Sequence, residues 1–235
     1  MTNNFDFNTY LYLSKKKNII SVYEKNKFEK VYEKETLINK PINSINYQEL
    51  DNFLNENIFR IEKKLNNFKK KLIVIIDLDF FFLFQLSIKK KDFENLNNLK
   101  SLIHLINEAK VNCKKTIDER RIIHLIINNY KINNENYSSL PKDLNTKSLS
   151  LDLKFICLSN EIIKNLEEIL NKYQISLSQI VDADYVKEFL NNKYNENIFL
   201  MTRKILSGYN PNEVLLVNKS NKNKGFFEKF FNLFS

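Results

Sequence analysis

Glycine is almost missing from this chain, which has only Gly208 and Gly225 among its 235 residues. Loops that cradle phosphate groups use glycine, because a residue without a side chain lets the backbone come close to the anion. Two isolated glycines cannot build such loops. The composition therefore excludes a glycine-rich nucleotide site, and we expect no cofactor.

Cysteine is equally scarce, and Cys113 and Cys157 form no CxxC pair. The N-terminal residues lack a signal-peptide pattern, so we expect a cytoplasmic protein with reduced thiols.

His104 and His124 lie far apart and have no partnering cysteine or acidic spacing, so we expect no metal site. No apolar run approaches the ~20 residues that a membrane-spanning helix needs.

What the chain does contain is enough apolar sequence for a core, with 43% hydrophobic residues, and many lysines and asparagines. The net charge of +9 is of the kind that favours nucleic acid or an anionic membrane. No zinc-finger spacing, helix-turn-helix pattern or RNA-binding aromatic motif is present, so we expect no nucleic-acid partner. An AT-rich bacterial genome would account for part of the lysine excess.

The first third of the chain predicts a strand meander, a helix and a buried strand. The strands are expected at Tyr10–Leu13, Ile19–Tyr23 and Phe28–Tyr32, the last half-buried because its apolar residues alternate. Residues 46–68 have helical apolar spacing, with Ser44 as the N-cap. The continuous apolar run Leu72–Ile76 is typical of a strand covered on both faces.

The rest of the chain predicts a second unit and then a less regular stretch over residues 185–217. We expect helices at Leu96–Val111 and Glu161–Tyr173, and a long polar loop over 133–148. The strands are expected at Phe80–Ile88, Arg121–Ile127, Leu149–Leu158 and Ile175–Val181.

Two segments in this region resemble one protein family. The segment DERRIIHLIINNYKIN, residues 118–133, is similar to a strand of FtsA. FtsA is the actin-like bacterial protein that tethers the FtsZ division ring to the membrane. His124, Tyr130 and Ile132 stand at the positions that match the family's pattern. Residues 153–185 match the strand, helix and strand that follow, and the INEAK segment matches the helix before. The resemblance is good over about 95–190 and only topological over 9–78.

The resemblance implies an α/β (α+β) fold. It has a degenerate actin-like, ribonuclease H-like subdomain and an SHS2 subdomain, named for its strand–helix–strand–strand order. The implied domains are the actin-like subdomain over 1–79, SHS2 over 80–184, a return to the actin-like subdomain over 185–217, and a linker with an amphipathic helix over 218–235.

The chain departs from the family where nucleotide would bind. The first phosphate hairpin should fall at 10–24, but that segment contains neither glycine nor aspartate. The glycine-paired loops expected after residue 195 are absent too, as is the glycine of the SHS2 loop near 140–144. We therefore predict a truncated, non-enzymatic protein without ATP binding, and leave binding of FtsZ open.

The last eleven residues, GFFEKFFNLFS, follow the polar, basic linker 218–224. On a helix the apolar residues gather on one side, opposite Glu228, Lys229 and Asn232. In FtsA-type proteins such a segment inserts into the inner face of the membrane; the alternative is a last core helix packed on the body. The expected membrane-binding residues are Phe226, Phe227, Phe230, Phe231, Leu233, Phe234, Lys222, Lys224 and Lys229.

A rival interpretation comes from LIVIIDLDFF, residues 72–81. An apolar run followed by Asp-x-Asp resembles the nucleophile strand of haloacid-dehalogenase-type, Mg²⁺-dependent phosphohydrolases, with Asp77 as nucleophile and Asp79 as general acid. Phe81 stands where that family has a small or hydroxyl residue. The simpler interpretation is that both aspartates end a buried strand and begin a turn.

These observations predict a non-enzymatic FtsA-like cell-division protein, peripheral on the inner face of the cytoplasmic membrane. Its expected partners are anionic lipid and divisome proteins, with FtsZ and FtsN as candidates and self-association through SHS2 as a further contact.

Overall fold

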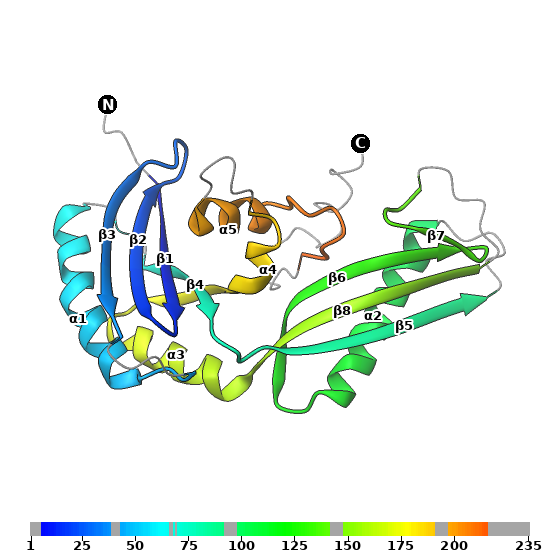
Figure 1. The fold of residues 1–235 in the computed structure, drawn as a ribbon, viewed down its shortest axis with the longest axis horizontal. Coiled ribbons are helices and arrows are strands. Elements are labelled where there is room, and N and C mark those ends of the chain that lie inside the picture. The colour runs from blue at the N-terminus through cyan, green and yellow to red at the C-terminus, as the bar shows by residue number, and fades with distance from the viewer. Residues whose placement is uncertain are drawn as a thin grey trace.

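The computed structural model describes residues 6–38, 43–65, 68, 70–91, 98–141, 148–190 and 197–215. The chain forms two β-sheets, each with helices packed against it, arranged side by side (Figure 1). It enters the second sheet after the fourth strand and returns to the first sheet for the last one.

The first sheet contains five strands in the order β3-β2-β1-β4-β9. The first three form an antiparallel meander, whereas β4 and β9 run parallel to β1. The carboxyl ends of three strands therefore meet at one edge of this sheet. The bounds are β1 (Phe7–Ser14), β2 (Lys17–Glu24), β3 (Lys30–Leu37), β4 (Lys71–Asp77) and β9 (Ser176–Asp182).

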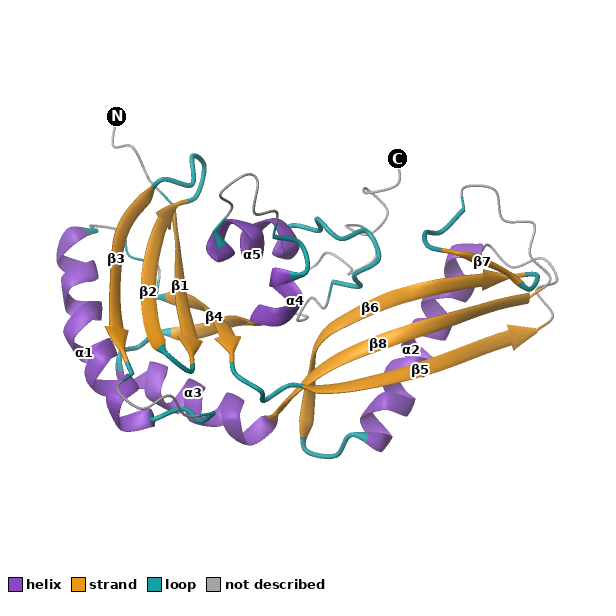
Figure 2. Cartoon of the chain, in the orientation of Figure 1, coloured by secondary structure: helices purple, strands orange, loops and turns teal. Residues whose placement is uncertain are grey.

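Helices cover both faces of the first sheet (Figure 2). On one face α1 (Tyr47–Lys64) and α3 (Asn160–Lys172) bury their apolar sides against residues such as Leu11 and Val74. On the other face α4 (Ala183–Lys187) and α5 (Ile198–Leu206) pack against residues such as Tyr10 and Ile75. Alternate residues of each strand thus serve two separate cores.

The second sheet has the strand order β5-β8-β6-β7, and all its pairs are antiparallel. The helix α2 packs on one face and shares a core with Leu125 and Phe155. Apart from the short strand β7, the chain order strand, helix, strand, strand is the predicted one, and the predicted α/β fold class is confirmed. The bounds are β5 (Phe82–Lys91), α2 (Asn98–Thr116), β6 (Arg120–Ile132), β7 (Glu135–Tyr137) and β8 (Ser148–Ser159).

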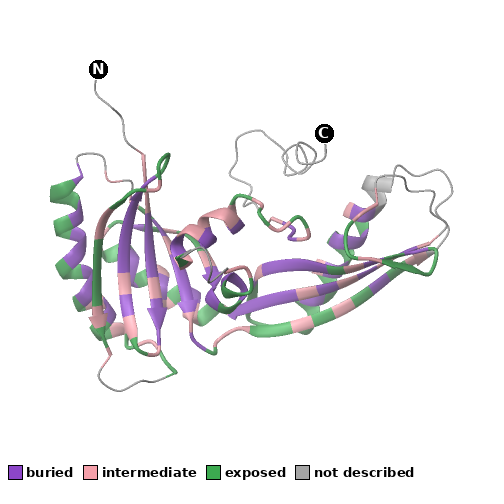
Figure 3. Ribbon diagram, turned by 45° about the horizontal axis from the view of Figure 1, so that its top comes forward, coloured by how far each residue is buried: buried purple, intermediate pink, exposed green. Residues whose placement is uncertain are grey.

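Burial follows this two-sheet arrangement (Figure 3). Most residues of the central strands are buried and nearly all the rest are half-buried, whereas the edge strand β3 is mostly exposed. Cys113 and Cys157 are buried free thiols in the second core, as expected of small apolar residues. In the part of the chain that the structure describes, every helix is too short or too polar to cross a bilayer.

Several local predictions were wrong. Asn46, not Ser44, caps α1, because its side chain accepts a hydrogen bond from the Glu49 N–H. Phe28 lies in a turn with a positive φ of 57°, so the third strand begins two residues later than predicted and continues to Leu37. The loop predicted from residue 133 contains the short strand β7, which forms a hairpin with β6.

Candidate functional site

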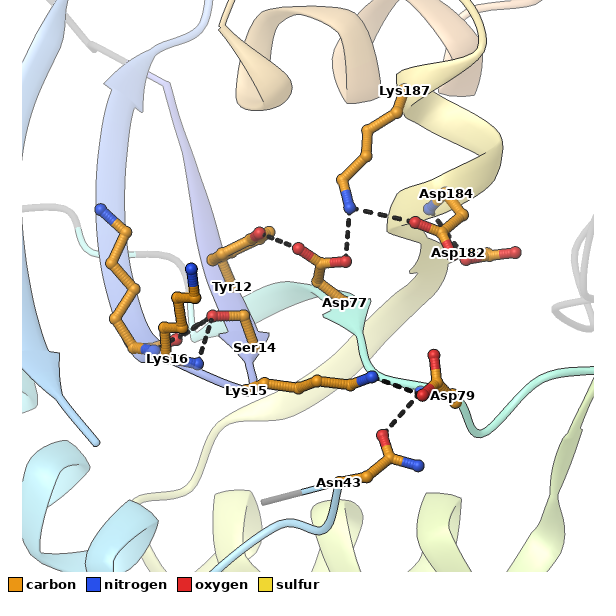
Figure 4. Close-up of polar contacts among 11 residues, drawn as sticks. Tyr12, Ser14, Lys15, Lys16, Asn43, Asp77, Asp79, Asp182, Asp184 and Lys187 are labelled. Carbon is orange, nitrogen blue, oxygen red and sulfur yellow. Dashed lines mark hydrogen bonds and ion pairs between the residues drawn. The ribbon is translucent and has the colours of Figure 1, made fainter. Parts of the chain in front are cut away.

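The carboxyl ends of β1, β4 and β9 meet at one edge of the first sheet. In open α/β sheets ligands bind in the crevice beyond the carboxyl ends of the parallel strands. Here the three strands end at Ser14, Asp77 and Asp182. Polar side chains from these ends gather at the same place (Figure 4), so this edge is where a site would lie.

Asp77 has both carboxylate oxygens occupied by neighbours. The Tyr12 hydroxyl donates to Oδ2, and the Lys187 ammonium donates to Oδ1 at 2.5 Å. Burial, and then the hydrogen bond to Asp77, raise the pKa of Tyr12, which keeps its hydroxyl a donor. Burial lowers the pKa of Lys187, but Asp77 and Asp184 together raise it above its usual value. The charge of the Asp77 carboxylate is therefore balanced by Lys187, and both of its oxygens already have partners within the protein.

Asp79 lies in the turn after β4 and forms an ion pair with Lys15 of the first hairpin. Its backbone N–H donates to the side-chain oxygen of Asn43 at 2.9 Å. The hairpin itself is closed by Ser14, whose hydroxyl accepts from the Lys17 N–H at 3.1 Å. A serine side chain thus makes the turn at which the resemblance to FtsA would place a glycine-bearing phosphate hairpin.

The pairing at Asp77 and Asp79 bears on the phosphohydrolase interpretation. That chemistry needs Asp77 free to attack phosphorus beside a Mg²⁺ ion and Asp79 free to donate a proton, whereas here each carboxylate is paired with a different lysine, Lys187 and Lys15. Within the described ranges no three His, Cys, Asp or Glu side chains are grouped so as to hold a metal ion. Asp77 ends β4 and Asp79 lies in a turn, as the simpler interpretation predicted. The arrangement therefore fits a structural role better than a Mg²⁺ site.

Asp182 ends β9 and is buried beside the junction of the two sheets. Its side chain accepts the Asp184 N–H at 3.0 Å and so caps α4, while its own N–H donates to Nε2 of His124 at 3.2 Å. Burial raises the pKa of Asp182. The ionised carboxylate is therefore less favoured in the folded chain than in the unfolded one.

This shift predicts how Asp182→Asn should behave. A carboxyl group with a raised pKa in the folded state contributes stability at pH values below its pKa in the unfolded state. That contribution is lost as the pH rises through the pKa of the folded state. Asparagine cannot ionise, yet its side-chain oxygen can still cap α4. Thermal melts should therefore show Asp182→Asn at least as stable as the unaltered chain at neutral pH, with its relative advantage shrinking in acid. A variant that melts lower only at neutral pH would contradict this account.

A buried network of hydrogen bonds lies next to Asp182. Nδ1 of His124 is 2.7 Å from one carboxylate oxygen of Glu213, and the Tyr185 hydroxyl donates to the other at 2.9 Å. The Asn210 amide in turn donates to that hydroxyl at 2.9 Å. Because Nε2 of His124 accepts the Asp182 N–H, the ring proton lies on Nδ1 and is donated to Glu213.

The network ties together segments that are distant in the sequence. It joins β6 of the second sheet to the end of β9, the start of α4 and residues 210–213. The same segment also bonds to β6 through its backbone, from Val214 N–H to the Leu125 carbonyl. The sequence placed His124 in a strand, which is confirmed, but gave no sign of Glu213.

The predicted membrane-binding residues fall outside the described residues, because the last of these is residue 215. This applies to Lys222, Lys224, Lys229 and to the apolar residues of the same segment, Phe226, Phe227, Phe230, Phe231, Leu233 and Phe234. Their role stays a prediction. Of the other candidates, His104 is exposed on α2, 3.8 Å from Glu108, as expected for a helix-surface residue.

Comparison with known proteins finds no matching family model and no matching curated protein. Among solved structures, the chain is similar to the PilM–PilN type IV pilus biogenesis complex, with 10% identity, a TM-score of 0.48, and coverage of 76% of this chain and 48% of that one.

Two further solved structures are more distant. One is the cytoplasmic domain of EpsL, an inner membrane component of the type II secretion system of Vibrio cholerae, with 9% identity, a TM-score of 0.40, and coverage of 77% of this chain and 59% of that one. The other is a Bacteroides thetaiotaomicron protein with an actin-like ATPase fold and unknown function, with 11% identity, a TM-score of 0.32, and coverage of 80% and 57%. The chain thus spans about half of the length of the structures it matches.

Proposed function

We propose that this chain is a non-enzymatic, actin-like assembly protein that attaches its partners to the inner face of the cytoplasmic membrane. The observation that carries this proposal is the segment 225–235, in which five phenylalanines and a leucine follow a polar, basic linker. The resemblance of residues 118–133 and 153–185 to FtsA supports cell division as the setting, with FtsZ and FtsN as candidate partners.

The physical chemistry of the segment suits a surface anchor. Ten helical residues rise only ~15 Å, about half of the hydrocarbon core, so the segment can lie in the interface but cannot cross. Burial of each large apolar side chain is worth roughly 1.5–3 kcal/mol, and each cation near an anionic surface about 1 kcal/mol more. The cost of ordering the segment offsets part of this gain, so several associated copies would bind much more tightly than one.

The proposed absence of enzymatic activity is supported by the carboxyl edge of the first sheet. Lys15 and Lys187, two cations at this edge, are already paired with Asp79 and Asp77. We expect ATP with Mg²⁺ to leave the melting temperature unchanged, because a ligand stabilises a fold only by binding to it. A dose-dependent rise, or hydrolysis of p-nitrophenyl phosphate that Asp77→Asn abolishes, would contradict the proposal.

The anchor itself is tested by Phe230→Asp in the full chain. A charge in the middle of the apolar side should lower the affinity for anionic liposomes by at least about tenfold, since it removes one buried phenylalanine and adds a repelled carboxylate. Asn232→Asp is the matched control, because it adds the same charge on the polar side of the helix. Equal pelleting of the two variants would refute the anchor.

A further inference from the structure

The edge strands of the two sheets differ in how they are protected. An exposed edge strand has unpaired N–H and C=O groups that can pair with another strand, and natural proteins block such edges with charges, bulges, short strands or covering segments. The edge strand β3 carries four charged residues, Lys30, Glu33, Lys34 and Glu35, and β9 has a bulge where it pairs with Leu72 and Ile73. The outer side of β6 is covered by β7 and by residues 212–214.

The strand β5 has none of these protections over most of its length. Within the described residues it pairs only with β8, through ten residue pairs without any shift of register. Its residues are uncharged from Phe82 to Ile88 and include neither glycine nor proline. Phe82 and Leu83 are 41% and 56% exposed. Within the described residues β5 therefore leaves an edge roughly 33 Å long open to a further strand, and the first seven residues of that edge are uncharged.

Charge indicates which kind of strand would fit. The uncharged part of β5 is followed by Lys89, Lys90 and Lys91. Residues 82–159 together contain thirteen Lys and Arg residues but only eight Asp and Glu residues. Pairing with a second copy would bring two such basic units side by side, and like charges across an interface are unfavourable. A strand with acidic residues opposite the lysines would instead be attracted.

We propose that the free edge of β5 binds an extended segment of another protein by β-strand addition. The segment runs antiparallel to β5, like every other pair in this sheet. Its N-terminal residues are acidic and lie opposite Lys89 and Lys90. Its following residues alternate apolar and polar and lie along Phe82–Ile88. Backbone hydrogen bonds supply affinity, and the lysines set direction and charge preference.

The test uses the full chain and two labelled peptides of identical composition, EDETVTVTV and its reverse, VTVTVTEDE. Fluorescence anisotropy measures binding, and amide hydrogen exchange locates it. The first peptide should bind at least about tenfold more tightly than the second, because only it places its carboxylates at the lysines in an antiparallel pair. Exchange of β5 amides should become slower when it binds.

Charge reversal supplies the matched variants. Lys89→Glu with Lys90→Glu should weaken binding of EDETVTVTV at least about tenfold and should favour the basic peptide KKKTVTVTV. Lys27→Glu with Lys34→Glu makes the same change on exposed residues of the hairpin formed by β2 and β3, and it should alter the binding of neither peptide. Equal binding of the two acidic peptides, slower exchange at β3 instead of β5, or β5 protection that grows with protein concentration without peptide would overturn the proposal. The last result would assign the edge to a second copy of this chain.

Discussion

Replacing Glu213 by leucine should destabilise the fold by about 3 kcal/mol, because two buried donors then lose their acceptor. Those donors are the Nδ1–H of His124, which is 2% exposed, and the hydroxyl of Tyr185. Each lies where water cannot replace the carboxylate. Urea unfolding, followed by the change in midpoint, measures the loss.

Glu188→Leu is the matched control for this prediction. Glu188 is exposed and pairs with Lys154 at 3.3 Å, so the same substitution there should change stability by no more than about 0.5 kcal/mol. Combining Glu213→Leu with His124→Leu should cost less than the sum of the two, since the pair acts as a unit. Additive losses, or equal effects at Glu213 and Glu188, would show that the network does not hold the junction together.

The second large loss of stability is expected for a substitution at Phe199, whose side chain packs α5 against the first sheet. Its side chain is 5% exposed and its ring centroid lies 5.7 Å from that of Tyr10 and 5.8 Å from that of Tyr23. Phe199→Ala should cost about 3–5 kcal/mol, because it removes a buried ring and leaves a cavity among aromatic neighbours.

Phe59 offers the same chemical change at an exposed position. It lies on the outer side of α1 and is 61% exposed, so Phe59→Ala should change stability by no more than about 0.5 kcal/mol. Amide exchange adds a second readout, since the loss of Phe199 should speed exchange in α5 before it does so in the central strands. If α5 keeps its protection and the midpoint is unchanged, the helix is held by other contacts.

Local patterns in the sequence were enough to find most elements of the fold. The helix expected over 46–68 is present as Tyr47–Lys64, and the one expected at Glu161–Tyr173 as Asn160–Lys172, because apolar residues at three- and four-residue steps define a buried side. The apolar run Leu72–Ile76 lies inside β4, which is buried between two layers of helices as its composition indicated.

The errors have local physical causes. The alternation of apolar residues suggested that Phe28 begins a strand. The residue instead lies in the turn with positive φ, and its ring stacks on that of Tyr23. Its apolar side chain is therefore explained by this tertiary contact and not by a strand. The helix α2 continues to Thr116, beyond its predicted end at Val111, because Cys113 keeps the buried spacing. Single apolar residues near an element's end are ambiguous for this reason.

The polar contacts of the candidate site could not have been predicted from spacing at all. Glu213 meets His124 across 89 residues of sequence, and Lys187 meets Asp77 across 110. Such contacts depend on how distant elements pack together in three dimensions, and local periodicity holds no information about that packing. The aspartates at strand ends were visible in the sequence, whereas the lysines that pair with them were not.

Liposome co-sedimentation of the intact chain beside a version ending at Lys224 tests the central claim most directly. We expect the intact chain to pellet with anionic liposomes and less with neutral ones. The shortened chain should stay in the supernatant, and both should melt at the same temperature. If both chains stay soluble and the shortened one melts lower, residues 225–235 belong to the core of the protein, and the membrane-tethering function is wrong.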